Sequence, residues 1–573
     1  MENIGRAGDS ESLPILHVRT DEPTSPRLSP VSSSVLSSSV CPRRRLTEFS
    51  ASPSTPDLGN TFLPDVEPSG SKPVSPRLVR SKTLPGRTTS GTTNIPGLEG
   101  VSVDPNKIES LRKWILGIAI VTFDLELGPT LACVFPQLRL YDFEAENIAF
   151  SSFPDSPQFR EGCSIHSFRI RVRPSPLSSR SSVLSDRPEL RDGFMYGYSY
   201  FSQRKDLTSR RGYSQWSIVI LSQHPFVALF SSVIASLGPL YHAHGEAILE
   251  VASHNIASWP TPVPGTTVEL GFVGSVMHAE LPRNVDEQQL SNTAHLHSQN
   301  DQNWHVLVCA PPVHPPPLHL FQASFTHLWS IWECLVLCEP ILIFGSSPAV
   351  TSQAVWWLRD LFRPIPWAGD FRPYFTIHDK ELNSLVNDKP PKPGLLLGVT
   401  NPFFSKSCSH WPHVLSLGKE SGKGSVTFTA QVVGPPPGWT TKRHKRYISK
   451  DPQILQQMQD ALGKHPEKLQ ETSLTLGRHL SSRTAAMLVP LNRYINTLIP
   501  SPTEKASRLR PFNNAHFFAL LRTHGSPLPF KSSTKQRLFY ERWLRTPAFG
   551  LWLARQEEIV GDVLMSRASS SLP

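Results

Sequence analysis

The chain has 573 residues, which at about 150 residues per domain allows four compact domains or fewer. Its 55 prolines are far above the average share, whereas 13 Trp and 29 Phe are enough to build folded cores. The composition therefore excludes a fully disordered protein, a collagen and a coiled coil. The net charge of +10 directs attention to nucleic acids and anionic membranes as partners.

The positive charge is concentrated in one short segment. The densest basic run is Lys442–Arg446, followed by Lys450, and no acidic residue lies between Pro435 and Lys450. Because the excess is local and flanked by prolines, we expect no nucleic-acid partner. Two interpretations of 435–450 remain open, a solvated linker and a patch for an anionic membrane surface or an acidic partner.

The seven cysteines indicate a reducing compartment. They contain no CxxC pair, and Met1 leads into Glu2 and Gly5 rather than into a basic and then apolar signal peptide. The most apolar stretch, Leu328–Phe344, contains Glu333 and Glu339, which would be costly inside a bilayer. We therefore expect a soluble, cytoplasmic protein.

Residues 1–107 are predicted to be a disordered tail. They are rich in Ser, Pro and Thr and nearly devoid of aromatic residues, so they cannot bury enough apolar surface to offset the entropy of ordering. The tail contains motifs for proline-directed and basophilic kinases, which suggests regulation by phosphorylation. These motifs are Ser25-Pro26, Ser29-Pro30, Ser52-Pro53, Thr55-Pro56, Ser75-Pro76 and Arg44-Arg45-Leu46-Thr47.

A first α/β unit is expected over 108–260. Apolar runs and turn residues predict a mostly antiparallel sheet followed by helices. A helical stretch from Phe226 to Ser258 is expected to break at Gly238-Pro239. A polar Ser/Pro/Arg insertion occupies 174–193. The predicted strands are Trp114–Thr122, Thr130–Phe135, Phe168–Val172, Phe194–Phe201 and Trp216–Leu221, with a short helix at Tyr141–Phe150.

A second α/β unit is expected over 302–434, after a linker and polar loop at 261–301. Helix–strand alternation indicates this class, and Ser347-Pro348 is a well-formed helix start. Beyond it, Val350, Ala354, Trp357, Leu358 and Leu361 share one helical face. The other predicted elements are a helix at His327–Cys338 and strands at Trp304–Ala310, Ile341–Phe344, Tyr374–Ile377, Leu395–Val399, His413–Leu417 and Val426–Val433.

The last part, 451–562, is predicted to be helical and to be followed by a short tail, 563–573. Apolar residues from Leu480 to Leu498 keep a period of 3.6, with a kink expected at Pro490. Three shorter helices are predicted at Phe512–Leu521, Gln536–Leu544 and Phe549–Ile559. The predicted class is thus α/β followed by all-α.

Searches for reaction chemistry give a negative result. Gly418–Ser425 imitates a phosphate-binding loop but has the wrong glycine spacing and lies between strands, so a hairpin turn is favoured. Cys408, His410 and His413 are zinc-type ligands without a fourth partner, and packing roles are favoured. We found no nucleophile motif, although a triad scattered along the chain would leave no motif. We therefore expect no catalytic residue, no metal and no cofactor, a profile that suits a protein that binds another protein.

Several motifs resemble a known family, the tripartite DENN module. Residues 123–128, 152–155, 196–206 and 211–222 of this chain resemble the upstream part of the module. The central part of the module is resembled by Trp332-Glu333 through Glu339-Pro340, Ser347-Pro348, Asp370–Asp379 and Gly398–Phe404. The helical end of the chain resembles the downstream part. The likeness covers roughly 110–562 and is greatest to the sixth subfamily of DENN-domain-containing proteins.

The resemblance implies both a fold and a function. It implies a longin-like α/β first lobe, a larger α/β central lobe and a helical third part. It also implies guanine-nucleotide exchange on a Rab GTPase, without covalent chemistry, by a cytoplasmic protein recruited to recycling endosomal membranes. The Rab is expected in the groove at the junction of 110–258 and 302–434.

Four polar residues inside the family-like motifs are candidates for contact with the partner, namely Asp155, Arg204, Arg372 and Asn401. For each of them a capping or loop-fixing role is the competing interpretation. Three alternatives to exchange also stay open: a non-exchanging Rab effector or trafficking scaffold, a lipid-surface adaptor that uses Lys442–Lys450, and a hydrolase with an unrecognised nucleophile.

Overall fold

The computed structural model describes residues 92–93, 104–155, 161–172, 187–188, 190, 192–210, 212–286, 303–312, 314–418, 434–463, 465–501 and 508–570. Several predictions concern segments outside these residues. They are the disordered tail up to residue 103 apart from 92–93, most of the insertion at 174–193, the polar loop from 287, the hairpin turn near Ser425 and the strand Val426–Val433.

The first part of the described chain is built on an antiparallel sheet. Its strands are β2 (Gly117–Asp124), β3 (Gly128–Phe135), β5 (Gly162–Arg171), β6 (Phe194–Lys205) and β7 (Tyr213–Ser222). They lie in the order β3-β2-β7-β6-β5, and every neighbouring pair is antiparallel. The predicted antiparallel sheet is confirmed, with strands longer than expected at β5, β6 and β7. A two-residue pairing also joins β1 (Thr92–Thr93) to β4 (Leu140–Tyr141).

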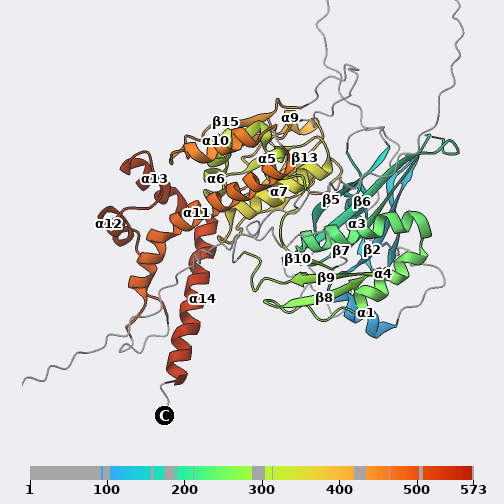
Figure 1. Cartoon of the computed structure of the whole chain (residues 1–573), viewed down its shortest axis with the longest axis horizontal. Helices are drawn as coiled ribbons and strands as arrows, with labels where there is room; N and C mark the ends of the chain where they lie inside the picture. The colour runs from blue at the N-terminus through green and yellow to red at the C-terminus, as the bar shows by residue number, and fades with distance from the viewer. Residues whose placement is uncertain are drawn as a thin grey trace, which may run out of the picture. The chain divides into compact units, whose positions relative to one another are not determined.

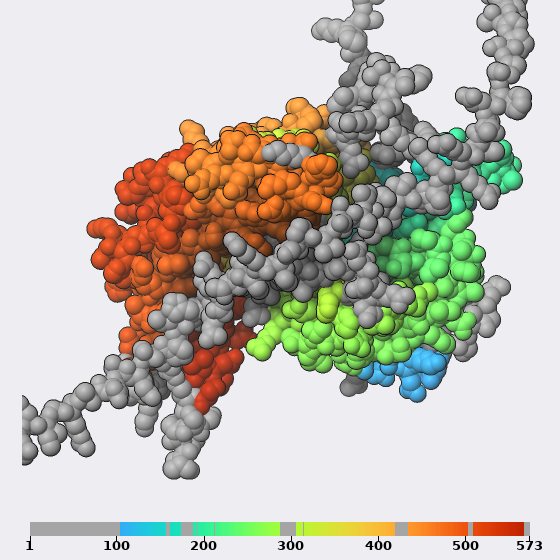
Figure 2. All heavy atoms as spheres, viewed as in Figure 1, coloured from blue at the N-terminus to red at the C-terminus, as the bar shows by residue number. Residues whose placement is uncertain are grey.

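Helices cover both faces of this sheet. They are α1 (Pro105–Arg112), α2 (Asp142–Ser151), α3 (Val227–His244) and α4 (Ala247–Ala257). Alternation along β6 directs Tyr196, Tyr198 and Tyr200 into one core with α3 and α4, while Met195 and Phe201 enter a second core with α2. In Figure 1, α3 and α4 lie together over the strands. Half of the α1 residues are exposed, and Figure 2 shows α1 in blue at the surface.

The predicted break in the long helical stretch is wrong in position. Helix α3 continues through Gly238 and Pro239 and ends at His244, where the next residue is Gly245, whose φ of 63° favours glycine. Gly238 has a packing role, because a Cβ atom there would lie 2.4 Å from the Tyr200 ring. The Gly-Pro pair thus marks a close helix–sheet contact.

The segment 261–301, expected to be a linker and polar loop, contributes a β-hairpin. The hairpin consists of β8 (Thr267–Phe272) and β9 (Ser275–Glu280), and β10 (Asn303–Leu307) lies parallel to β9. Leu270 and Phe272 of β8 pack into the core shared with α3 and α4. A two-residue turn closes the hairpin, with positive φ at both Val273 and Gly274.

The central part contains a mostly parallel sheet in the order β12-β13-β11-β14-β15. Its strands are β12 (Phe371–Arg372), β13 (Leu396–Val399), β11 (Ile341–Phe344), β14 (His413–Ser416) and β15 (Gly438–Thr441), and only β15 is antiparallel to its neighbour. Ile341 and Ile343 point into one core, and Leu342 and Phe344 into another. Burial on both faces explains why the β11 sequence is continuously apolar.

Helices of the central part lie along this sheet and beside it. They are α5 (Pro317–Leu320), η2 (Gln322–His327), α6 (Leu328–Val336), α7 (Pro348–Phe362), α8 (Leu382–Leu385) and α9 (Phe403–Ser407). The predicted start of α7 is confirmed, since Ser347 Oγ accepts a hydrogen bond from Val350 N at 3.4 Å.

Two predictions for the central part require correction. Residues 374–377 form no strand, because the Tyr374 side chain leaves the sheet and joins the core beneath α2. The segment 435–450, considered as a solvated linker, forms the edge strand β15 and then buries Tyr447 and Ile448. The basic residues of this segment therefore lie among residues that pair in the sheet or pack in the core.

The C-terminal part is helical, as predicted. Its helices are α10 (Pro452–Ala461), α11 (Pro466–Leu498), α12 (Asn514–His524), α13 (Ser533–Trp543) and α14 (Pro547–Ser570). Helix α11 contains the predicted apolar face and continues through Pro490. Within the described part of the chain, no helix combines the length and apolar character needed to cross a bilayer.

Candidate functional site

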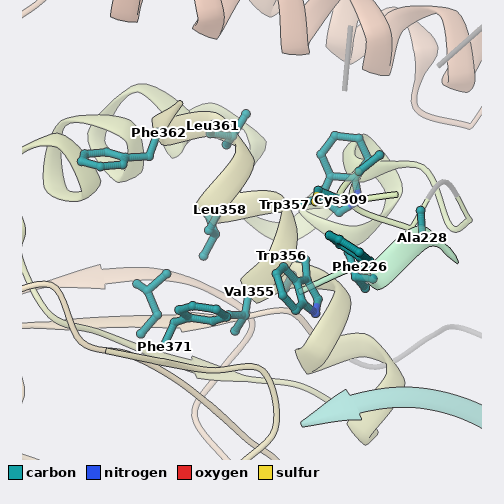
Figure 3. Close-up of a cluster of buried hydrophobic side chains, with 14 of the residues drawn as sticks. Phe226, Ala228, Cys309, Val355, Trp356, Trp357, Leu358, Leu361, Phe362 and Phe371 are labelled. Atoms are coloured by element: carbon teal, nitrogen blue, oxygen red, sulfur yellow. The ribbon is translucent and has the colours of Figure 1, made fainter. Parts of the chain in front are cut away.

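The candidate site is the junction between the first sheet and the central sheet, where α7 contacts both. The Trp356 indole Nε1 of α7 donates a hydrogen bond to Ser167 Oγ of β5 at 2.7 Å. The Trp356 ring also lies 5.3 Å from the ring of Phe371 on β12. Figure 3 shows these aromatic side chains with Val355 and Leu358. Helix α7 therefore joins the two sheets through buried contacts.

Tyr374 fixes the loop that follows α2. Its hydroxyl accepts a hydrogen bond from Asp155 N at 2.7 Å and donates one to Phe153 O at 3.1 Å. The Tyr374 side chain is buried in the same core as Phe153. One side chain of the central part thus determines the course of the first part at 153–155.

Asp155 and Asn401 meet across this junction. The Asn401 side chain and Ile377 N lie beside the Asp155 carboxylate and favour its ionised form. Burial nevertheless raises the pKa of Asp155 to about 6. Its Oδ2 atom is buried and has no hydrogen-bond partner among the described residues. The sequence candidates Asp155 and Asn401 are therefore one unit in space.

Asn401 also fixes the local backbone. Its Oδ1 accepts a hydrogen bond from Phe403 N at 3.0 Å, at the start of α9. This is the loop-fixing role that competes with partner contact. The Asn401 side chain is half-buried, so it lies close to the surface as well as to Asp155.

Arg372 is the centre of a buried ionic cluster. The side chain is fully buried and forms ion pairs with Asp370, at 3.0 Å, and with Glu381. Burial by itself would lower the pKa of Arg372, but the neighbouring carboxylates outweigh that effect and raise it. Arg169 of β5 pairs with the same Asp370 at 3.1 Å. Arg372 therefore holds β12 against β5 from inside the junction.

Arg204 lies apart from the other three candidates. It is exposed near the end of β6, and its guanidinium contacts the ring of His242 on α3. Burial and the charge of Arg204 lower the pKa of His242. Within the described ranges, Arg204 forms no hydrogen bond or ion pair with Asp155, Arg372 or Asn401.

Sequence reasoning missed two polar residues of the junction, Arg169 and His166. Both lie on β5, where a charged or ionisable side chain inside an apolar strand is the signal that points to a buried partner. His166 Nε2 lies 2.9 Å from Ser151 O, and burial lowers the pKa of His166 to about 4. The ring is therefore neutral at pH 7, and Nε2 donates to the carbonyl.

The three zinc-type residues do not converge. His410 Nε2 lies 3.1 Å from Lys389 O, and His413 Nδ1 lies 2.9 Å from Thr441 Oγ1. Burial raises the pKa of Cys408 to about 12, so its thiol stays protonated. Among the residues with described positions, no three His, Cys, Asp or Glu side chains are placed to hold a metal ion.

No protein-family model matches the chain. Curated relatives match over most of its length. Protein DENND6A of Mus musculus is 33% identical over 475 residues, which are 79% of this chain and 78% of the mouse protein. Protein DENND6B of Homo sapiens is 32% identical over 470 residues, 78% of this chain and 79% of the human protein. The DENND6 homolog of Dictyostelium discoideum is 28% identical over 521 residues, 77% of this chain and 70% of that protein.

These findings first define the class of protein to which the chain belongs. A mixed α/β fold with several sheets and a helical C-terminal region, together with relatives of this kind, is that of a DENN-domain protein. Within that class, the chain belongs to the DENND6 family.

Proposed function

We propose that the protein is a guanine-nucleotide exchange factor for a Rab GTPase, acting in the cytoplasm and on recycling endosomal membranes. Membership of the DENND6 family is the observation that carries this proposal. The module boundaries belong to the proposal as well: a longin-like upstream part at 108–260, a central part at 302–434 and a downstream part at 451–562. The hairpin β8–β9 packs on α4, so we assign it to the upstream part.

Exchange requires binding energy rather than bond chemistry. A factor that binds the nucleotide-free GTPase more tightly than the loaded form weakens nucleotide binding by the same ratio. A thousandfold weakening corresponds to about 4 kcal/mol of differential binding. A surface that spans two firmly joined sheets is suited to this task, because it can favour an open arrangement of mobile GTPase loops.

The surface beside the junction is where we place the Rab. Asp155 and Asn401 are half-buried there and come from different parts of the chain. A partner that contacts them would touch both parts at once. Arg372 is fully buried, so its influence on a partner would act through the shape of the junction. Arg204 would extend the contact along the end of β6.

The test is release of fluorescent GDP from a panel of purified Rab proteins by the full chain. We expect at least one Rab to release GDP faster, and the double variant Asp155→Ala/Asn401→Ala to be impaired at least about tenfold, a loss of about 1.4 kcal/mol. Asp388→Ala, at an exposed position nearby in sequence, is the matched control and should keep full activity.

Binding measurements separate exchange from the effector or scaffold alternative. An exchange factor prefers the nucleotide-free Rab, whereas an effector prefers the GTP-bound form. If no Rab binds more tightly when emptied of nucleotide, the exchange proposal is wrong. If exchange persists in the double variant with a normal unfolding profile, the placement at the junction is wrong.

A further inference from the structure

The basic segment after β15 is held in a defined position. Glu333 of α6 is fully buried, and its carboxylate accepts hydrogen bonds from Tyr447 N at 2.9 Å and from Ile448 N at 2.8 Å. The same carboxylate lies 2.7 Å from His444 Nε2. Because the segment is bound to α6 at several points, the side chains between and beyond these points have fixed starting positions.

A second set of hydrogen bonds brings in the chain before α13. Ile448 forms a β-bridge with Phe530, and Lys531 N donates to Tyr447 O at 2.9 Å. Ser449 N donates to Pro529 O at 2.9 Å. This pairing places Lys531 beside the segment from 446 to 450.

Four basic residues lie near one another here, and we name Arg446, Lys450, Lys531 and His327 the basic cluster. Burial and the charges of Arg446 and Lys531 lower the pKa of Lys450. Burial and the charges of Lys450 and Arg446 likewise lower the pKa of His327, at the end of η2. Lys450 and His327 therefore both have positively charged neighbours that disfavour their own charged forms.

The nearby carboxylates are occupied elsewhere. Glu333 is bound to His444 and to backbone amides, and Glu339 to Arg542. Asp451 caps α10 and lies 3.4 Å from Arg483. In the part of the chain with described positions, the basic cluster has no ion pair with a carboxylate, and Arg446 Nη1 is buried with no hydrogen-bond partner.

Two lysines and an arginine precede Arg446 in the sequence and add exposed positive charge to this segment. Lys442, Arg443 and Lys445 are all exposed. A convergent set of cations next to an exposed basic run suits two features of one partner, a compact multivalent anion and the weaker negative surface around it.

We propose that the basic cluster binds the phosphorylated headgroup of a polyphosphoinositide in a membrane, while Lys442, Arg443 and Lys445 lie toward the surrounding anionic lipids. A phosphomonoester carries about −1.5 to −2 charges and three acceptor oxygens, which match a guanidinium and ammonium groups better than a single lipid carboxylate does. This inference goes beyond nucleotide exchange and does not depend on it.

The experiment is flotation of the full chain with three kinds of vesicle. One contains phosphatidylcholine with a few per cent phosphatidylinositol 4,5-bisphosphate, one contains phosphatidylserine at equal total charge, and one contains phosphatidylcholine alone. We expect at least about tenfold tighter binding to the phosphoinositide vesicles than to the phosphatidylserine vesicles, and competition by soluble inositol trisphosphate. Lys450→Gln/Lys531→Gln should lose about tenfold or more of this binding, at about 1 kcal/mol per cation near the surface.

The control removes two charges elsewhere. Lys389→Gln/Lys406→Gln changes two exposed lysines and should bind the phosphoinositide vesicles within about twofold of wild type, since a change in net charge alone has little effect on a specific site. Equal loss in both double variants, equal binding to phosphatidylserine vesicles, or unchanged binding of Lys450→Gln/Lys531→Gln would each overturn the proposal. GDP release from a Rab in solution, without vesicles, reports exchange separately and should be the same in both variants.

Discussion

Asp155 and His166 are two titratable residues of the junction whose pKa values shift in opposite directions. Burial raises the pKa of Asp155 to about 6, so the folded state favours the protonated carboxyl. This contribution to the free energy of unfolding is complete below the usual pKa of 3.8 and is lost as the pH rises through 6. Burial lowers the pKa of His166 to about 4, so the folded state favours the neutral ring. This contribution to the free energy of unfolding is present above pH 6.5 and is lost as the pH falls through 4. The two residues therefore oppose each other between pH 4 and 6.5.

The first prediction concerns Asp155→Asn. Because an amide does not ionise, the variant should be more stable than wild type at pH 7.5, by about 3 kcal/mol for the rise in the Asp155 pKa from 3.8 to about 6. The difference should vanish near pH 4. Urea unfolding from pH 4 to 8 measures it, with Asp388→Asn as the exposed control. A variant that is less stable than wild type at pH 7.5 would contradict this account.

The second prediction concerns Arg372→Met. The substitution removes the fully buried cation between Asp370 and Glu381. Arg169 and the exposed Arg171 stay beside these carboxylates, so we expect a loss of about 3 kcal/mol of unfolding free energy. Arg204→Met, which changes an exposed arginine, should stay within about 0.5 kcal/mol of wild type. Chemical denaturation at pH 7 compares the two, and similar stabilities would refute the role assigned to Arg372.

At the scale of elements, the structure agrees with the sequence where local signals and packing coincide. Strand β11 occupies the predicted residues 341–344, and α7 begins at the predicted Ser347-Pro348. In β11 a continuous apolar run suits burial on both faces, and at α7 the capping hydroxyl and proline act within one turn. Such elements depend mainly on their own residues.

Elements whose signals depend on distant contacts were not predictable in the same way. Residue preferences predict a helix break at Gly238-Pro239, but the structural reason for Gly238 is the Tyr200 ring on another element. Residues 374–377 have a strand-like pattern because Tyr374 and Phe375 enter two different cores. Likewise, Asp155 and Asn401 belong to separate sequence motifs, and their proximity depends on how two sheets pack.

Gly238→Ala tests this explanation. The added Cβ atom would lie 2.4 Å from the Tyr200 ring, so α3 or the ring must move, at a cost of about 1–3 kcal/mol. Gly561→Ala is the matched control in α14, where an added Cβ meets no atom within 4 Å. It should stabilise the protein by about 0.5–1 kcal/mol through helix propensity. Thermal unfolding compares them, and equal effects would argue against the close contact at Gly238.

For the whole molecule, the decisive feature is that cores extend across the three parts. One apolar core contains residues of the first sheet, the central sheet and the C-terminal helices, including Tyr198, Ile343 and Trp543. Tyr374 of the central part lies in the core beneath α2. The parts are therefore expected to stabilise one another.

Tyr374→Phe examines this coupling. The change removes the hydroxyl between Phe153 O and Asp155 N while keeping the ring, so we expect a loss of about 1–2 kcal/mol. Hydrogen exchange should become about tenfold faster at the Asp155 amide, with amides in α12 as the internal reference. Unchanged exchange at Asp155 would show that the hydroxyl does not hold the two parts together.

The position of helix α7 between three neighbours limits how its sequence can vary and how the fold can be engineered. Trp356 faces the first sheet, Ala354 and Leu358 lie in the shared core, and the helix contacts β13 on one side and α11 on another. Substitutions in α7 must fit three neighbours at once, so we expect the α7 sequence to vary little among relatives. A chimera that exchanges the first sheet between two such proteins would have to take its α7 from the same parent.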